Sequence, residues 1–322
     1  MNVCLIGDGL ISLSLAKALI NNNFKVFMFV RHNSKTPNDI RTIGISSSNI
    51  DFFQKEILRI KKNLIWDIFG IEIYNNQNKE EKILDFKDSN KILFSIIRNK
   101  DLYNLLNQSL KKNSNFKKII IKNKSFYKKN KFDFIINCDG NNEIFRKYFS
   151  RKILKDYNST AYASIINHNK TKNRNAFQVF TNIGPVAFLP TSETKTSVVC
   201  SVKNKYRLSQ SDFNKIIYKN NKKYNIKSIK NFETFPLKSK ILKNYYKNNI
   251  LAFGDILHQI HPLSGQGFNM TIRDIKVLLR LFSERKNLGL AIDYSVFEEF
   301  EKKTKHLNFI FSSGNDFIYE FF

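Results

Sequence analysis

Cysteine is scarce in this chain, and its three copies lie far apart in the sequence. Cys4, Cys138 and Cys200 form no Cys-x-x-Cys pair, which argues against a disulfide scaffold and against a cysteine-based zinc site. We therefore expect a reducing compartment, the cytoplasm. The chain also lacks any run of about eighteen apolar residues, so we expect no membrane-spanning helix.

Acidic residues are few relative to basic ones. The chain has 27 Asp and Glu against 54 Lys and Arg, which gives a formal net charge of +27. The lysines are scattered among asparagines along the whole sequence, as a drift in composition produces, and no nucleic-acid-binding motif gathers them. We expect no nucleic-acid partner. A basic surface of this kind would nevertheless favour contact with an anionic membrane.

The chain opens with a pattern that is typical of doubly wound α/β proteins. A strand over Val3–Ile6, a glycine turn, a helix over Leu10–Asn21 and a second strand over Lys25–Val30 follow one another. Alternating, β-rich stretches occupy residues 159–202, and a short buried strand over Ile250–Phe253 then resumes the first pattern. With 42% hydrophobic residues to build a core, the sequence predicts a Rossmann-like α/β domain interleaved with a β-rich α+β domain.

Other elements are expected from periodicity. We expect helices at 48–60, Asp101–Lys111, 209–222, 268–284 and from 293, and strands at 70–74, 82–86, Lys117–Ile121, Phe132–Asn137, 159–166, 175–181, 185–189, 196–202 and 232–236.

The first motif of interest is the turn Gly7-Asp8-Gly9, which joins a strand to a helix. Glycines there allow a tight turn and let backbone N–H groups approach a pyrophosphate at the helix N-terminus. Two features weaken the match to a dinucleotide-binding turn. Ser12 stands where a third glycine is usual, and the acid expected at the end of the second strand is missing, because Val30 and Arg31 stand there.

Two further motifs follow apolar strands. Residues 133–140 end in Asp139-Gly140, which by itself is better explained as a plain turn. Residues 254–274 combine Gly254-Asp255 with a Pro-x-x-Gly-Gln-Gly loop that leads into a helix. A carboxylate at a strand end can accept hydrogen bonds from sugar-like hydroxyls, and the helix N-terminus favours a ligand that becomes anionic.

The three motifs, in this order, resemble those of the FAD-dependent class A aromatic monooxygenases. Residues 261–269, His-Pro-Leu-Ser-Gly-Gln-Gly-Phe-Asn, resemble in particular the ubiquinone-biosynthesis hydroxylases. The segments 39–46 and 177–190 resemble further parts of that family, so the resemblance covers nearly the whole chain.

The resemblance implies an FAD-binding domain made of residues 1–70, 97–158 and 245–285, a β-rich substrate domain made of 71–96 and 159–244, and a C-terminal helical segment over 286–322, shorter than expected for the family. It also implies cofactor contacts. Gly7 and Gly9 would flank the FAD diphosphate, and Arg41 would lie near the phosphates or help NAD(P)H to approach. The other implied contacts are Asp139 and Gly140, where FAD and NAD(P)H both touch the protein, Asp255 at the ribityl or diphosphate group, and Pro262, Gly265, Gln266, Gly267 and Asn269 around the flavin ring.

The function implied by the resemblance is hydroxylation of an aromatic ring with NAD(P)H and O₂, the substrate being a polyprenylated phenol of ubiquinone biosynthesis. The flavin performs the chemistry, so we assign no catalytic residue, and we expect no metal site at His258 and His261. We expect a cytoplasmic protein, with peripheral attachment to the inner face of the membrane as a further possibility. Two alternatives stay open: a flavin-binding partner without catalysis in a ubiquinone-biosynthesis assembly, and an FAD-dependent reductase on the same fold.

Departures from the family pattern motivate the non-catalytic alternative. Besides Ser12 and Val30, the pair Ile256-Leu257 replaces two small residues after Gly-Asp, and Met270-Thr271 replaces a more usual Leu-Gly. The larger pair is expected to crowd the flavin.

Overall fold

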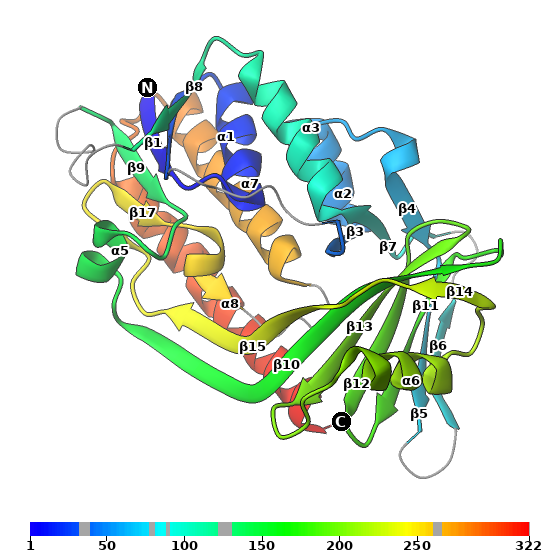
Figure 1. The fold of residues 1–322 in the computed structure, drawn as a ribbon. Helices are drawn as coiled ribbons and strands as arrows, with labels where there is room; N and C mark the ends of the chain where they lie inside the picture. The colour runs from blue at the N-terminus through cyan, green and yellow to red at the C-terminus, as the bar shows by residue number, and fades with distance from the viewer. Residues whose placement is uncertain (32–38, 77–80, 88–90, 122–130, 260–265, 322) are drawn as a thin grey trace.

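A computed structural model describes residues 1–31, 39–76, 81–87, 91–121, 131–259 and 266–321, with side chains described up to residue 314 and not at residue 266. Two parts face each other, as Figure 1 shows: a helix-covered sheet that contains both ends of the predicted α/β pattern, and a larger sheet built mainly from the middle of the chain. None of the helices in the described ranges is long and apolar enough to cross a membrane.

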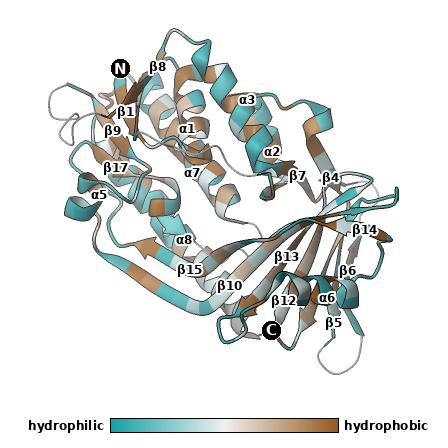
Figure 2. Ribbon diagram, viewed as in Figure 1, coloured by the Kyte–Doolittle hydropathy of each residue, from teal (hydrophilic) through white to brown (hydrophobic). Residues whose placement is uncertain are grey.

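The first sheet has six strands in the order β16-β17-β9-β1-β2-β8. All neighbours are parallel except β16 and β17. The inner strands are almost continuous runs of buried apolar residues, as parallel strands covered on both faces require, and Figure 2 shows them as mostly hydrophobic. The bounds are β1 Asn2–Ile6, β2 Lys25–Val30, β8 Phe116–Ile120, β9 Phe134–Asn137, β16 Tyr246–Lys247 and β17 Ile250–Ala252.

Helices pack on this sheet through their apolar faces. The helix α1 (Leu10–Asn21) lies against α3 (Asn99–Lys111) and α7 (Gln266–Asn287), and α7 lies against α8 (Ser295–Phe321). Their leucine, isoleucine and phenylalanine side chains form one continuous core with the six strands. The structure thus confirms the predicted doubly wound opening, and β17 joins the same sheet beside β9.

The second sheet has nine strands in the order β18-β15-β10-β13-β12-β11-β5-β6, with β14 paired to β10. It is antiparallel except where β11 meets β5. The bounds are β5 Gly70–Asn75, β6 Glu81–Lys87, β10 Lys152–His168, β11 Asn175–Thr181, β12 Gly184–Pro190, β13 Lys195–Lys203, β14 Ile226–Ile229, β15 Glu233–Leu242 and β18 His258–Gln259.

The two faces of the nine-stranded sheet differ in side-chain size. One face carries Tyr162, Phe177 and Phe188, which pack under α6 (Gln210–Asn220) in a core of their own. The alternate residues on the other face are mostly small, and this small-residue face turns toward the first part of the molecule, because the Thr42 hydroxyl donates to Ser197 Oγ on it at 3.2 Å. The small-residue face comprises Ala161, Ala163, Ala187, Ser197, Val199 and Ser201.

A third, three-stranded antiparallel sheet was not predicted. It has the order β3-β7-β4, with bounds β3 Thr42–Ser46, β7 Phe94–Arg98 and β4 Ile65–Ile68. The predicted helix at 48–60 is also shorter than expected. It consists of α2 (Ser47–Phe52) and a π-helical turn (Phe53–Ile57), after which Leu58 is extended.

Two strands extend beyond their predicted lengths. β10 begins at Lys152 rather than at residue 159, and β15 continues to Leu242 rather than ending at 236. They pair along their length, with a register shift between Asp156 and Ser159 that Asn158 accommodates at a φ of +51°. This long ribbon runs between the two parts of the molecule (Figure 1). Remaining short elements are α5 (Glu143–Tyr148) and the 3-10 turns Lys62–Leu64 and Gly254–Ile256.

Candidate functional site

The first component of the site is the turn between β1 and α1. Gly7 has a φ of +106°, which disfavours any residue with a Cβ atom. α1 begins after Gly9 without a side-chain cap, and a Cβ atom at Gly9 would meet nothing within 4 Å. The helix N-terminus therefore offers backbone N–H donors and its positive dipole end to the space in front of the turn.

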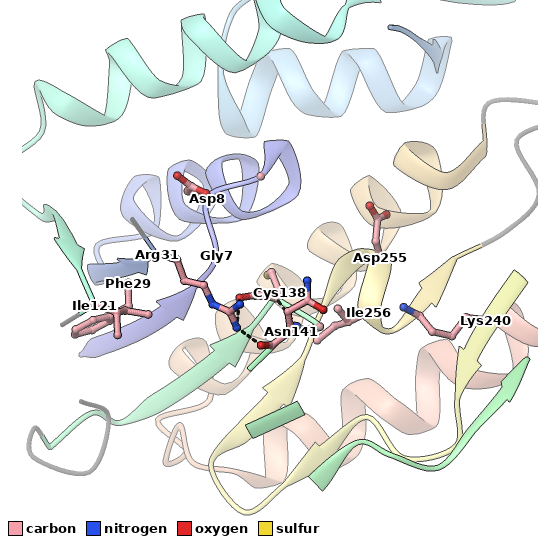
Figure 3. A pocket seen from close by; sticks show the side chains of 13 residues that line it. Gly7, Asp8, Phe29, Arg31, Ile121, Cys138, Asn141, Lys240, Asp255 and Ile256 are labelled. Carbon is pink, nitrogen blue, oxygen red and sulfur yellow. Dashed lines mark hydrogen bonds and ion pairs between the residues drawn. The ribbon is translucent and has the colours of Figure 1, made fainter. Parts of the chain in front are cut away.

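A cleft of about 580 Å³ lies in front of this turn (Figure 3). Its volume falls within the range of small-molecule sites. It brings together all three sequence motifs, because β1, β9 and β17 are neighbours whose carboxyl ends share one edge of the sheet. The lining residues are Gly7, Asp8, Gly9, Phe29, Arg31, Ile121, Cys138, Asp139, Gly140, Asn141, Lys240, Asp255 and Ile256.

The loop after β9 places Asp139 at the cleft. One carboxylate oxygen of Asp139 accepts a hydrogen bond from the backbone N–H of Asn141 at 2.9 Å, which is the turn that the sequence alone could explain. The other oxygen lies 3.3 Å from the guanidinium of Arg31. Asp139 therefore stabilises the turn after β9 through one carboxylate oxygen and presents the other oxygen, paired with Arg31, at the cleft.

Asp255 follows β17 and is exposed to the same cleft. Although the side chain opens into the cleft, the protein atoms packed around it reduce its hydration, and this desolvation raises its pKa, while the nearby charges of His258, Lys240 and Arg41 act in the opposite direction. A carboxylate in this position would gain from the hydroxyl donors of a bound ligand.

The side chains after Asp255 do not both face the cleft. Leu257 is fully buried in the core, so, contrary to the expectation from the sequence, it does not crowd the site. Ile256 does line the cleft, and a Cβ atom at Gly140 would lie 3.3 Å from its Cγ2. The predicted crowding is therefore restricted to one side chain.

Arg41 lies outside the group of residues that line the cleft. Its guanidinium stacks on the ring of Phe235 in β15, 3.9 Å from the centroid. Burial lowers its pKa, and the carboxylates of Asp255 and Glu233 raise it. Arg41 therefore lies near the small-residue face and within electrostatic reach of Asp255, which favours the flavin end of a bound cofactor over the diphosphate end.

The motif that leads into α7 is described only in part. Pro262 and Gly265 lie outside the described residues, and Gln266 begins α7. Gly267 lies in the first turn of α7, where a Cβ atom would meet nothing within 4 Å.

Asn269 was predicted as a cofactor contact, and its side chain has structural partners. Its Oδ1 accepts hydrogen bonds from Ser46 N and Asn49 Nδ2, both at 2.9 Å, and its Nδ2 donates to Gly44 O at 2.9 Å. Asn269 thereby ties α7 to β3 and α2. A cofactor contact by this residue stays a prediction.

His258, which the sequence places in the motif that leads into α7, forms a pair with another side chain of the core. Its Nε2 lies 2.5 Å from Asp274 Oδ2, and both side chains are fully buried. The pair connects β18 to α7. His261 lies outside the described residues.

Several cleft residues carry no motif and were not predicted. Phe29 and Ile121 form an apolar wall at the ends of β2 and β8, and Lys240 enters from β15 (Figure 3). The first two could have been found from their places at the carboxyl ends of parallel strands. Lys240 had no local signal, because only the pairing of distant strands brings β15 to the cleft.

The profile of a protein family described as FAD binding domain matches residues 74–287, more than half of the chain. The chain therefore belongs to this FAD-binding family.

Curated relatives match over different lengths. The 3-demethoxyubiquinol 3-hydroxylase of Escherichia coli is 34% identical over 86 residues, which cover 26% of this chain and 22% of that protein. The ubiquinone biosynthesis monooxygenase COQ6 of Danio rerio is 24% identical over 49% of this chain and 41% of its own length. The COQ6 of Dictyostelium discoideum is 22% identical over 100% of this chain and 84% of its own length. The matched segments thus span less than half of the first two relatives.

Solved structures share the fold. The probable FAD-dependent monooxygenase PqsL of Pseudomonas aeruginosa superposes with a TM-score of 0.80 at 14% identity, covering 98% of this chain and 94% of that one. CtdE, solved in complex with FAD and a substrate, gives 0.75 at 14% identity, covering 98% and 88%. These structures confirm the predicted class of fold.

The residues of the cleft fit FAD. The uncapped N-terminus of α1 and the open space at Gly9 suit a diphosphate, and the carboxylate of Asp255 suits ribityl hydroxyls. The individual contacts of Gly7, Gly9, Asp139, Gly140 and Asp255 with the cofactor stay predictions.

We predict that Gly9→Val yields protein without flavin. The valine would extend into the cleft where the diphosphate must approach, while the structure leaves room for it within the fold. Flavin released from purified protein is measured by absorbance. Gly314→Val, at another glycine whose Cβ would meet nothing within 4 Å but which does not line the cleft, serves as the control. Flavin content equal to wild type in Gly9→Val would contradict the prediction.

We predict that Asp255→Ala weakens FAD binding by a factor of about 5 to 150, because hydroxyls left unpaired cost roughly 1–3 kcal/mol. Asp255→Asn keeps the shape and one acceptor, so its affinity should be intermediate.

Because the pKa of Asp255 is raised, wild-type affinity for FAD should fall with decreasing pH earlier than for an ordinary carboxylate, and Asp255→Asn should lose this dependence. Fluorescence titration with FAD measures both effects, and an unchanged dissociation constant in Asp255→Ala would remove Asp255 from the site.

Proposed function

We propose that the protein is an FAD-dependent monooxygenase that hydroxylates an aromatic ring with NAD(P)H and O₂. A polyprenylated phenol of ubiquinone biosynthesis is the proposed substrate class. The observation that carries the proposal is the arrangement of one cleft, which begins at the phosphate-type turn of α1 and ends between Asp255 and Lys240 of β15. Arg41, which is within electrostatic reach of Asp255, stacks on Phe235 of the same strand.

The small-residue face supports a ring-shaped substrate. A ring lying against strands β10, β12 and β13 on this face would meet alanine, serine and valine side chains, whereas the opposite face of the sheet carries the larger Tyr162 of β10, Phe177 of β11 and Phe188 of β12. Phe235 and the guanidinium stacked on it stand at the border between this face and Asp255. A planar ring would therefore lie between the sheet and the flavin end of the cleft.

A bound FAD would supply the redox chemistry that links NAD(P)H to O₂. The residues of this chain would bind and orient the cofactor and the substrate and would shield them from water. The turn at Gly7 and Gly9 and the carboxylate of Asp255 fix the cofactor, and the two facing sheets limit the access of water to the ring. No side chain is assigned as an acid or base.

The names of the matched relatives support the choice of pathway. The E. coli relative is named for hydroxylation of a demethoxyubiquinol, and the COQ6 relatives for ubiquinone biosynthesis. The matches cover 22% of the E. coli protein and 41% of the Danio rerio protein, so the activity and the substrate of this chain are proposals.

The activity is tested with purified, flavin-loaded protein. We predict that a phenol carrying a short prenyl chain stimulates NAD(P)H oxidation and O₂ uptake together, and that the product is the hydroxylated ring. Ala187→Phe, which places a large side chain on the small-residue face, should keep its FAD and lose this stimulation. Ala291→Phe, at an exposed position outside the cleft, should change neither.

Two other outcomes reject the hydroxylase, and a third rejects the position proposed for its substrate. A colourless protein would favour the partner without catalysis. Hydride transfer without O₂ uptake would favour the reductase. Full phenol stimulation in Ala187→Phe would place the substrate elsewhere.

We also propose reversible attachment to an anionic membrane, since a polyprenyl tail must be collected from a bilayer. Lysines and exposed apolar side chains support it: Phe309, Ile310 and Phe311 of α8 are 53%, 62% and 48% exposed. Ion pairs of Lys302 and Lys305 with Glu298 and Glu301 weaken the local positive charge of the same helix. The attraction must therefore come largely from the net charge of the chain.

We predict that the protein sediments with anionic vesicles at low salt and is released as salt rises, because charges separated by more than about 10 Å are screened at 0.1 M salt. Zwitterionic vesicles serve as the control. Deleting Phe317 to Phe322 should weaken the binding to anionic vesicles relative to the full chain. Full binding by the truncated chain would mean that the attraction is electrostatic and does not need this segment. Absence of binding to anionic vesicles at low salt would reject the proposal.

A further inference from the structure

The end of β2 differs from the usual dinucleotide-binding pattern. An acidic side chain at this position ordinarily binds the hydroxyls of a ribose. Val30 occupies the position here and is buried in the core, 3% exposed. The next residue is Arg31, whose side chain is about half exposed and lines the cleft. The structure therefore replaces an anion at this edge of the site by a cation.

The side chain of Arg31 extends across the site. β1 lies between β2 and β9 in the sheet. From the end of β2, the guanidinium reaches Asp139 Oδ2 after β9 at 3.3 Å and donates a hydrogen bond to the carbonyl of Asn141. It thus spans the end of β1, beside the turn at Gly7 (Figure 3).

The charges of the cleft favour a contact between Arg31 and an anionic ligand. The described lining residues include three carboxylates, Asp8, Asp139 and Asp255, and two cations, Arg31 and Lys240. The carboxylate of Asp8 is paired with Lys118 at 2.9 Å, and Lys240 lies toward Asp255 at the other end of the cleft. A diphosphate bound beside the α1 turn would therefore lie close to Arg31, which is the lining cation at that end of the cleft.

We propose that Arg31 binds the diphosphate in the ADP half of FAD, by exchanging the carboxylate of Asp139 for phosphate oxygens. A guanidinium has several donors in a fixed plane and suits bidentate contact with phosphate. In the ion pair that must open, the side chain of Arg31 is 49% exposed and that of Asp139 is 22% exposed, and ion pairs accessible to solvent contribute little stability. Phe29 and Ile121, the apolar wall on the same side of the cleft, would then contact the adenine.

This inference rests on the FAD assignment but not on the proposed hydroxylation. In this chain, a cationic contact to phosphate would replace an acidic contact to ribose as the anchor of the adenosine half. Affinity would then depend on the charge of the ligand.

The test compares ligands that contain different parts of FAD. Arg31→Met removes the charge at similar length, and Arg31→Lys keeps a charge without the planar fork. Titration calorimetry or flavin fluorescence with FAD, ADP and riboflavin gives three dissociation constants for each variant. Arg280→Met, at an exposed arginine of α7 that is paired with Glu284 and does not line the cleft, is the control for the loss of one positive charge.

We expect Arg31→Met to weaken the binding of FAD and of ADP by the same factor, about 10- to 100-fold, which corresponds to about 1.4–2.8 kcal/mol of binding free energy. Riboflavin should bind as it does to wild type, Arg31→Lys should be intermediate, and Arg280→Met should change none of the constants. The salt dependence of ADP binding should be reduced in Arg31→Met.

Unchanged or tighter binding of FAD and ADP in Arg31→Met would overturn the proposal, since the ion pair with Asp139 would then only obstruct the cleft. An equal loss of riboflavin affinity would also overturn it, because the effect would not be confined to the ADP half. If wild-type protein bound no FAD, the cofactor assignment itself would fail, which is a distinguishable result.

Discussion

The close packing between the end of β17 and the first turn of α1 is the constraint on which the site depends. Gly254 has a φ of +75°, and a Cβ atom there would lie 2.5 Å from the side chain of Ile11. Glycine alone permits this approach. The approach places Asp255 at the edge of the space that the Gly7 turn opens, so that one ligand could contact the helix N-terminus and the carboxylate at once. The positive φ of Gly7 completes this geometry.

The cleft has a second wall because two long strands connect the parts of the molecule. β10 and β15 run from the neighbourhood of α5 into the nine-stranded sheet, and Lys240 reaches the cleft from this ribbon. Contacts between the parts include polar ones, such as Thr42 with Ser197 and Ser239 with Ser312, and an apolar cluster in which Ile68 and Ile96 pack on Ala176. The stacking of Arg41 on Phe235 adds a charged contact at the same border. The proposed substrate space is therefore bounded by both parts.

Polar residues within the cofactor motifs also have structural partners. Asn269 is bonded to β3 and α2, and His258 is paired with Asp274 in the core. These ties fix the beginning of α7 and the strand before it, which flank the predicted flavin loop. A motif residue can thus be important for positioning without touching the ligand. The same distinction applies to Asp139, whose two oxygens have a structural contact and an ion pair facing the cleft.

The sequence by itself determined the features that depend on neighbouring residues. The opening strand, turn and helix, the glycines with positive φ and the strand that ends at Asp255 follow from local periodicity and from the conformational freedom of glycine. Because parallel strands present their carboxyl ends at one edge, the meeting of Gly7, Asp139 and Asp255 was also predictable.

Only the tertiary structure decided the rest. The sheet of β3, β7 and β4, the extra length of β10, the contact of Lys240 and the pairing of Arg31 with Asp139 join residues far apart in the chain. Such contacts depend on how sheets and helices pack, which no short window of sequence specifies.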